Sequence, residues 1–157
     1  MKKLITVLAL SAIMSVSAFA QTDTAVASFL NSLKSFLVEE GYGPKIDEDG
    51  DLQFKMEGRV FWYSVQQNSD GSFFVQFCRA SMGASDADMN AVYHAVNQVN
   101  AEYRCAKAYV NRASVQYSVE FFAESPAYAK RFFSKHISIL HDLASDCQEY
   151  YSQYADE

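Results

Sequence analysis

Three stretches of the chain place hydrophobic residues at intervals of three and four, the spacing that puts them on one face of an α-helix. The first covers about residues 23–40 and ends before Gly41, which suits the left-handed cap of a helix. The second begins near Ser85 and Asp88, and the last opens at Ser125-Pro126, a capping residue followed by a first-turn proline. The last stretch is the most regular and steps through Phe133, Ile137, Leu140, Ala144, Cys147, Tyr151 and Tyr154. We therefore predict three amphipathic helices.

Between the predicted helices, hydrophobic and polar residues alternate with a period of two, which predicts β-strands. Gly-containing pairs at residues 49–50, 57–58 and 70–71 cut the first of these regions into short segments, as tight hairpins require. Aromatic residues fall on both faces of the predicted strands, so we expect both faces of the sheet to be partly covered. The predicted strands span about residues 44–47, 52–56, 59–66, 72–79, 105–110 and 114–122.

The order of these elements predicts the fold class. One helix, three or four strands, a second helix, two strands and a last helix follow one another without an internal repeat or a long linker. A chain of 157 residues with this pattern is one α+β domain. We expect an antiparallel-rich sheet of about five strands with three helices. The first and last helices should pack together on one face of the sheet, and the second helix should lie elsewhere.

The first twenty residues have the pattern of a secretory signal peptide. Two lysines follow Met1, residues 4–14 are almost entirely apolar, and Ala18-Phe19-Ala20 supplies the small residues of a cleavage site before Gln21. The apolar run is shorter than the roughly 20 residues that span a membrane. We predict cleavage after Ala20, a single mature domain at residues 21–157, and a periplasmic or secreted protein.

Charge and composition narrow the function classes. The whole chain has a net charge of −6, and removal of residues 1–20 takes away two lysines and no acid, which leaves −8. Phosphate backbones and anionic lipid surfaces repel such a chain, so we expect no nucleic-acid partner and no membrane partner after cleavage. Its 12 Phe and 10 Tyr supply enough apolar surface for a packed core, which excludes intrinsic disorder.

The acidic segment at residues 47–51 suggests a calcium site, because hard cations bind clustered carboxylates. An EF-hand loop that begins at Asp47 would need glycine where Leu52 stands and glutamate where Gly58 stands. The motif therefore fails, and we interpret the segment as an acidic hairpin turn.

The three histidines also lack the spacing of a metal site. His136 and His141 are five residues apart, so on a helix they diverge by about 140° and cannot bind one metal from one face. His94 belongs to another predicted helix, and no paired cysteines are present to complete a zinc site. We predict no metal, no cofactor and no catalytic residue.

Cys78, Cys105 and Cys147 form no C-x-x-C pair, so a catalytic thiol is not indicated. If the second helix runs back along the sheet, Cys105 starts a strand about 25 Å from Cys78, far beyond the ~7 Å that a disulfide allows between Cα atoms. We predict that these two are unbonded. A bridge from Cys78 to Cys147 remains open, and three free thiols are favoured over it.

Asn97 and Asn100 lie in the second predicted helix, although asparagine is mildly unfavourable inside helices. Two interpretations stay open for them. The side chains either bond to a loop or strand end, or face the solvent.

Tyr150, Tyr151 and Tyr154 form an aromatic cluster near the end of the last predicted helix. The first helix is too short to cover the whole last helix, so we expect its half from Ala144 to Tyr154 to project beyond the sheet with these tyrosines uncovered. Exposed aromatic residues at this density favour association. We therefore predict them as candidate partner-binding residues, for a homodimer or for a protein or peptide partner.

Several short motifs resemble one bacterial family. They are Glu39-Glu40-Gly41-Tyr42, the acidic turn followed by Phe54-Lys55 and Glu57-Gly58, and Asn97 and Asn100 ahead of Lys107-Ala108-Tyr109-Val110. Over about residues 29–122 the chain resembles the YbjN family, whose members are described as sensory transduction regulators. The resemblance implies a fold similar to type III secretion chaperones, small α/β proteins that often form dimers and hold a partner segment without catalysis. Many family members lack a signal peptide, whereas this chain has the pattern of one.

These observations favour a secreted, non-enzymatic protein-binding module with a chaperone-like fold. Two alternatives belong to other classes. A small thiol- or histidine-dependent hydrolase would require a histidine beside a cysteine in a cleft. A small-ligand sensor would require a closed apolar pocket of roughly a few hundred Å³.

Overall fold

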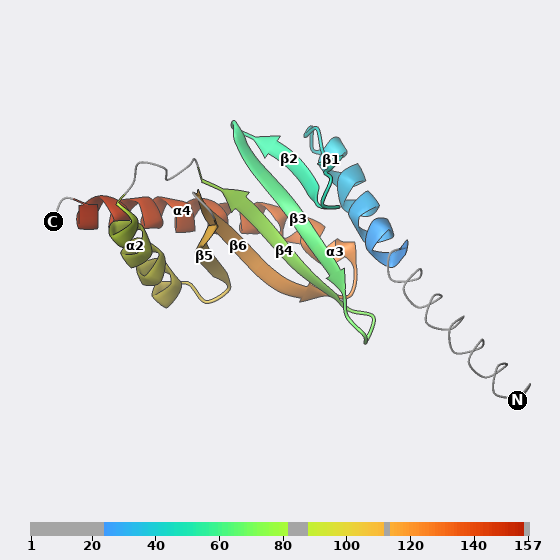
Figure 1. Cartoon of the computed structure of the whole chain (residues 1–157). Coiled ribbons are helices and arrows are strands. Elements are labelled where there is room, and N and C mark those ends of the chain that lie inside the picture. Colours follow the sequence, from blue (N-terminus) through green and yellow to red (C-terminus); the bar gives the residue numbers. More distant parts are fainter. Residues whose placement is uncertain (1–23, 82–87, 112–113, 156–157) are drawn as a thin grey trace, which may run out of the picture.

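Six strands form one antiparallel sheet, and the helices pack against it (Figure 1). The computed structural model describes residues 24–81, 88–111 and 114–155, so the predicted signal peptide lies outside the described residues. Within them, no helix is long and apolar enough to cross a membrane. The first helix covers residues 24–39, followed by β1 (Lys45–Ile46), β2 (Leu52–Met56), β3 (Arg59–Gln67), β4 (Phe73–Ala80), α2 (Met89–Glu102), β5 (Ala106–Asn111), β6 (Ser114–Ala123), α3 (Pro126–Arg131) and α4 (Phe133–Ala155).

The predicted α+β class and antiparallel sheet are confirmed. The strands pair in the order β1-β2-β3-β4-β6-β5, so the short strand predicted near residue 45 is the outer edge beside β2. The described residues contain six strands where about five were expected, and four helices where three were expected. Asp88 caps α2 by accepting a hydrogen bond from the Asn90 amide, while Ser85 lies outside the described residues.

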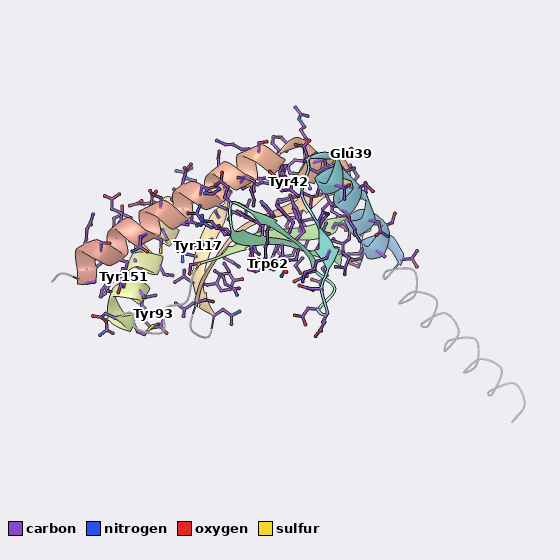
Figure 2. All side chains as sticks on the ribbon, turned by 90° about the horizontal axis from the view of Figure 1, so that it is seen from above. Glu39, Tyr42, Trp62, Tyr93, Tyr117 and Tyr151 are labelled. Carbon is purple, nitrogen blue, oxygen red and sulfur yellow. The ribbon has the colours of Figure 1, made fainter. Side chains whose placement is uncertain are left out.

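The helices cover one face of the sheet. A row of buried residues crosses the strands through Leu52, Tyr63, Phe77 and Val119 and faces the helices. The alternate residues face the other way, as Trp62 does in Figure 2, and no described helix covers them. The expectation that both faces are partly covered holds for burial, since Trp62 and Phe74 are half-buried, but no described helix provides the cover on this face. Helices with a single apolar stripe bury the most surface when all of them join one core.

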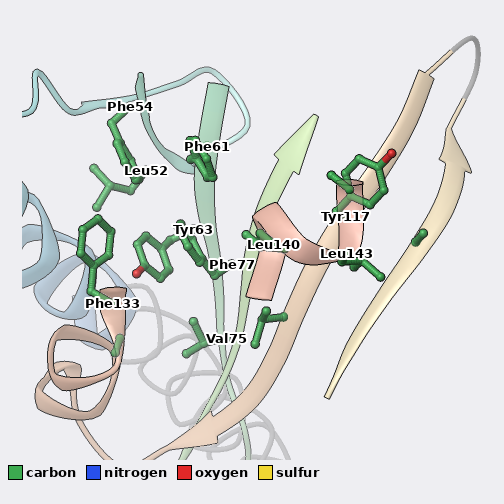
Figure 3. Close-up of a cluster of buried hydrophobic side chains, with 14 of the residues drawn as sticks. Leu52, Phe54, Phe61, Tyr63, Val75, Phe77, Tyr117, Phe133, Leu140 and Leu143 are labelled. Carbon is green, nitrogen blue, oxygen red and sulfur yellow. The ribbon is translucent and has the colours of Figure 1, made fainter. Parts of the chain in front are cut away.

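Aromatic rings build the core between the sheet and α4 (Figure 3). The fully buried ring of Phe77 lies 4.3 Å from the ring of Tyr63 and 5.8 Å from the ring of Phe61, measured between centroids. Phe36 of the first helix meets Phe133 of α4 at 5.5 Å. This contact joins the first and last helices as predicted, but it involves the start of α4.

The single long helix predicted after Ser125 is two helices, because the chain turns at Phe132 between α3 and α4. Phe132 has φ −101° and ψ 10°, which lie outside the α-helical range. Its ring packs 4.6 Å from that of Tyr128. No glycine or proline marks this break, so helix propensity could not indicate it.

α2 packs antiparallel against the second half of α4, and polar contacts hold the pair together. The hydroxyl of Tyr103 donates to Asp146 at 2.7 Å, and the hydroxyl of Tyr150 donates to Glu102 at 2.7 Å. The expectation that the second helix lies apart from α4 is therefore wrong. The buried residues of α2 are Ala91, Val92, Ala95 and Val99, and those of this part of α4 are Leu143, Ala144 and Cys147. The alanines on both helices allow their backbones to approach closely.

Asn100 joins α2 to the free edge of the sheet. Its side-chain Nδ2 donates to the Ala108 carbonyl at 3.0 Å, and its Oδ1 accepts from the Ala108 amide at 2.8 Å. β5 is an edge strand, so the asparagine amide takes the place that a neighbouring strand would occupy. Of the two interpretations of the asparagines, bonding to a strand is therefore correct for Asn100, whereas Asn97 is exposed.

We expect Asn100→Ala to lower the free energy of unfolding by about 1–2 kcal/mol, because both bonds to the β5 edge are lost. Asn97→Ala on the same helix is the matched control and should change stability by less than about 0.5 kcal/mol. Urea denaturation followed by circular dichroism measures both values. Equal effects of the two substitutions would show that the hydrogen bonds of Asn100 to Ala108 add nothing to the free energy of unfolding.

The three cysteines are free thiols, and Cys78 and Cys105 are unbonded as predicted. The argument from distance was wrong, however, because the register places Lys107 level with Ser118 and Cys78. Cys105 is two residues before Lys107 and therefore lies near the same level of the sheet as Cys78. The predicted separation fails because α2 packs on α4 instead of running back along the sheet. Cys78 and Cys147 lie on opposite faces of the sheet, which rules out the remaining bridge.

The thiols should differ sharply in reactivity. Cys105 is exposed, whereas burial raises the pKa of Cys78 to about 12 and also raises the pKa of Cys147. Because the thiolate is the reactive form, we expect one fast equivalent with a thiol reagent in the native protein. Unreduced protein in denaturant should give three equivalents. A second fast equivalent in the native state would contradict this burial.

Candidate functional site

A cavity of about 820 Å³ lies between the sheet, α2 and the second half of α4. The end of β4 and the starts of β3 and β6 contribute to it, and α2 and α4 enclose it from the other side. Figure 2 shows Tyr117 and Tyr151 below α4 at this end of the molecule. We call this cavity the α2–α4 pocket. Its volume falls in the range of natural ligand sites.

The pocket has an apolar interior and a polar mouth. The walls include the apolar side chains of Val92, Ala95, Val115 and Ala144. Asp142, Ser145 and Gln148 also line the pocket and are exposed, so they mark its opening to solvent. Such a combination can bind a ligand with both apolar and polar groups, and it leaves room for the rest of a longer ligand outside.

Arg79 is the buried cation of the pocket. It lies on the helix-facing side of β4, level with Phe61 and Tyr117, and is 8% exposed. Its Nη1 donates to the Leu140 carbonyl at 3.4 Å, and its guanidinium carbon lies 6.0 Å from the centre of the Tyr117 ring. Burial, followed by the charge of Arg59, lowers the pKa of Arg79.

Arg59 and His141 bring a second cation and a titratable ring to the same pocket. Arg59 Nη1 lies 3.2 Å from His141 Nδ1. Arginine can only donate, so this nitrogen must accept, and the imidazole is neutral in this arrangement. Burial, then Arg79 and Arg59, lowers the pKa of His141, while Glu57 and Asp142 act in the opposite direction. The sequence interpretation did not identify the arginines, although Arg79 continues the inward-facing alternation of β4.

His141 and Cys147 both line the pocket, which bears on the hydrolase alternative. They are six residues apart on α4, a rise of about 9 Å, and His141 Nδ1 contacts Arg59 instead. Burial raises the pKa of the Cys147 thiol, and a hydrogen bond from Tyr117 lowers it by less. A nucleophilic cysteine needs a lowered pKa and an adjacent base. The pocket therefore does not combine these two residues into a reactive pair.

The three candidate tyrosines have different surroundings. Tyr151 lines the α2–α4 pocket, Tyr150 bonds to Glu102, and the ring of Tyr154 stacks on His94 at 5.0 Å. The expectation that they project uncovered is wrong, because α2 covers this half of α4 and leaves all three partly buried. Their role in binding a partner stays a prediction, and Tyr151 is the one placed to contact a ligand in the pocket.

The sheet face away from the helices is a second surface. Phe122 is 69% exposed, and its ring lies 5.5 Å from that of Phe74. Glu120 bonds to Lys107 at 2.6 Å and accepts from Gln76. Burial favours a higher pKa for Glu120, but these two partners outweigh it and hold the pKa below its usual value.

The acidic segment forms the turn between β1 and β2, as predicted. The carboxylate of Asp47 accepts hydrogen bonds from the amides of Asp49 and Asp51 at 3.1 and 2.9 Å. This side chain therefore stabilises the hairpin. No group of three or more metal-binding residues occurs in the described part of the chain.

His136 lies in the aromatic core and not in the pocket. It is 6% exposed, its ring is 4.7 Å from that of Phe121, and its Nδ1 has no hydrogen-bond partner in the described part of the chain. Burial therefore lowers the pKa of His136.

We expect the protein to lose stability when the pH falls from 7.5 to 5.5. The unfolded chain then binds protons at His136 and His141 with the ordinary histidine pKa near 6.5, whereas the folded chain resists protonation. Each histidine can lower the free energy of unfolding by at most about 1.4 kcal/mol for each unit by which the pH falls. His136→Phe should flatten the dependence measured by urea denaturation. Unchanged slopes would contradict the buried neutral imidazole.

Comparison with known families supports a regulatory or binding role. The family model of YbjN, described as "Putative bacterial sensory transduction regulator", matches residues 30–124. The match includes all six strands of the sheet together with α2, and it confirms the resemblance seen in the sequence. A search of curated proteins found no match. The chain belongs to the YbjN family.

Proposed function

We propose that this YbjN-family protein is a secreted, non-enzymatic binding protein that holds a segment of a partner polypeptide in the α2–α4 pocket. The observation that carries the proposal is the open cavity of about 820 Å³ along the second half of α4. That helix half is also where the sequence predicts the partner-binding tyrosines, and Tyr151 lines the cavity.

The shape of the pocket favours a polypeptide segment over a small ligand. A sensor would enclose its ligand in a closed apolar cavity. Here the exposed residues Asp142, Ser145 and Gln148 leave the pocket open, so a chain can enter and continue outside it. The apolar wall provides hydrophobic contacts for one or two side chains of such a segment.

The proposal extends to compartment and mode of action. The signal-peptide pattern of residues 1–20 supports export, followed by action in the periplasm or outside the cell. The chaperone-like fold that the YbjN resemblance implies supports holding without catalysis, as a monomer or a homodimer. Fractionation of cells that produce the full chain, with mass measurement of the mature protein, tests export. A protein that retains Met1 in the cytoplasm would refute it.

The binding role is tested by photo-crosslinking from the pocket. A benzophenone amino acid replaces Gln148 at the mouth, and a control protein carries it at Ser138, an exposed position about three turns earlier on α4 and outside the pocket. We expect one defined partner segment, mapped by mass spectrometry, to crosslink from position 148 and not from position 138. Adding Ser145→Trp, which places a large side chain at the mouth, should abolish this crosslink.

A matched Ser138→Trp variant controls for the added indole and should leave the crosslink intact. Crosslinks that are equally frequent from both positions, or that survive Ser145→Trp, would refute binding in the pocket. Crosslinking to a second copy of the chain would show that the pocket mediates a homodimer. Sedimentation of both tryptophan variants then checks whether Ser145→Trp, but not Ser138→Trp, prevents dimer formation.

A further inference from the structure

Arg79 is a charged residue in a position built for an apolar one. On β4 it continues the inward-facing series of Phe73, Val75 and Phe77, and its row across the sheet contains Phe61 and Tyr117. With 8% of its surface exposed, the side chain is more than nine-tenths buried, yet it lines the α2–α4 pocket. A guanidinium keeps its charge in proteins, so the fold buries a cation here.

This cation has no anionic partner among the described residues. Its Nε is buried without a hydrogen bond, and Nη1 makes one long bond to a helix carbonyl at 3.4 Å. The described part of the chain forms one ion pair, between Lys107 and Glu120, and this pair lies on the opposite face of the sheet. Buried charges are normally paired, because an unpaired one costs several kcal/mol. The Tyr117 ring at 6.0 Å offsets only part of this cost.

The rest of the pocket adds positive charge. Arg59 is a second cation in its lining beside Arg79, with the neutral His141 next to it, and Asp142 is the one acidic residue among the described residues of the lining, where it is exposed to solvent. The chain without residues 1–20 has a net charge of −8, so the positive charge of the pocket is opposite in sign to that of the whole protein. An anion is attracted to the pocket by two guanidinium groups, and it would also favour protonation of His141.

We propose that the pocket recognises a carboxylate on the bound segment, held by the Nε and Nη groups of Arg79 with Arg59 at the mouth. The inference rests on the proposed function, whose ligand it describes in more detail. A planar carboxylate accepts two parallel hydrogen bonds from one side of a guanidinium. Such a pair would satisfy the buried Nε, and the apolar wall would contact the neighbouring side chain of the segment.

The test uses three pools of N-acetylated tripeptides and ¹⁵N-labelled mature protein. The first pool ends in a free carboxylate and contains no Asp or Glu, the second is its C-terminal amide, and the third is the amide with Asp or Glu at the middle position. Inorganic phosphate is a fourth probe. The Nε–H resonance of Arg79 reports on contact at the atom that lacks a partner. Titration gives an affinity for each probe.

We expect the free-acid pool or the Asp/Glu pool to move this resonance and to bind at least tenfold more tightly than the plain amide pool. Which of the two binds shows whether the carboxylate is a chain end or a side chain. Arg79→Lys should weaken binding at least tenfold, because lysine cannot form the two-bond contact. Arg79→Met should abolish the preference for acids without lowering the melting temperature of the free protein, since it removes an unpaired buried charge.

Other results would overturn the inference. Equal binding of the acid and amide pools, blocked by Ser145→Trp, would leave the proposed function standing and refute the carboxylate. Saturation by phosphate without preference for either acidic pool would also refute it. A large drop in melting temperature for Arg79→Met, with unchanged peptide preference, would show that Arg79 is structural. A pocket that binds none of the probes would refute the carboxylate, while the crosslinking result would decide the proposed function separately.

Discussion

Replacing Phe77 with alanine is expected to lower the free energy of unfolding by about 3–5 kcal/mol. Phe77 is fully buried at the centre of the sheet, and its ring contacts those of Tyr63, Phe61 and Phe133 (Figure 3). Truncation removes the apolar transfer energy of a whole ring and leaves a cavity that these neighbours can only partly fill. Urea denaturation followed by circular dichroism measures the loss.

Phe122→Ala is the matched control for this substitution. Phe122 lies on the adjacent strand β6 but is 69% exposed on the sheet face without helices. Its removal should change stability by about 0.5 kcal/mol or less. Similar losses for the two phenylalanines would mean that the core does not lie between the sheet and α4.

A chain that ends at Cys147 is expected to lose about 6 kcal/mol of stability or to unfold. The truncation removes Tyr150, Tyr151 and Tyr154, which are partly buried against α2 and the pocket. If each loses roughly half of the 150–250 Å² that a buried aromatic covers, the apolar term alone is about 2 kcal/mol per residue. This expected loss differs from the prediction made from the sequence, in which the three tyrosines were uncovered.

The full-length triple variant Tyr150→Ala, Tyr151→Ala and Tyr154→Ala separates the side chains from the missing backbone. It should lose nearly as much stability as the truncated chain. Tyr93→Ala, at a 56% exposed tyrosine of α2, is the control and should stay within about 0.5 kcal/mol of the natural protein. If the triple variant is fully stable but no longer associates in sedimentation, the tyrosines serve an interface instead of the core.

The secondary structure could be predicted because its signals are local. The seam of α4 lies at the predicted positions, with Leu140, Ala144 and Cys147 buried and Tyr151 partly buried. The alternation of β6 was also correct for Val115, Tyr117 and Val119. Ser118 departs from it, because it is fully buried although it faces the side without helices. There it lies level with Lys107 on the neighbouring strand and donates to Glu120 at 3.3 Å, contacts that a periodic pattern cannot show.

The candidate site could be predicted only in part. Tyr151 was identified from the aromatic cluster and lines the pocket, but the arginines were not identified. Arg79 was detectable as a charge on the inward-facing side of β4, which is where functional residues tend to break a pattern. Its meeting with Arg59 and His141 was not detectable, because the three residues come from different elements and α4 lies far from β3 and β4 in the chain.

The residue pattern was sufficient to predict the fold class, the order of the elements apart from the break at Phe132, their inward-facing sides, and the resemblance to the YbjN family. These depend on residue spacing within one element, and spacing is visible without partners. Only the packing of the elements showed that α2 covers the end of α4, that no described helix covers one face of the sheet, and that Arg79 lies buried in the α2–α4 pocket. Any apolar stripe can pack on any other, so the pairing depends on shape, on the closeness that small residues such as Ala95 allow, and on the total surface buried.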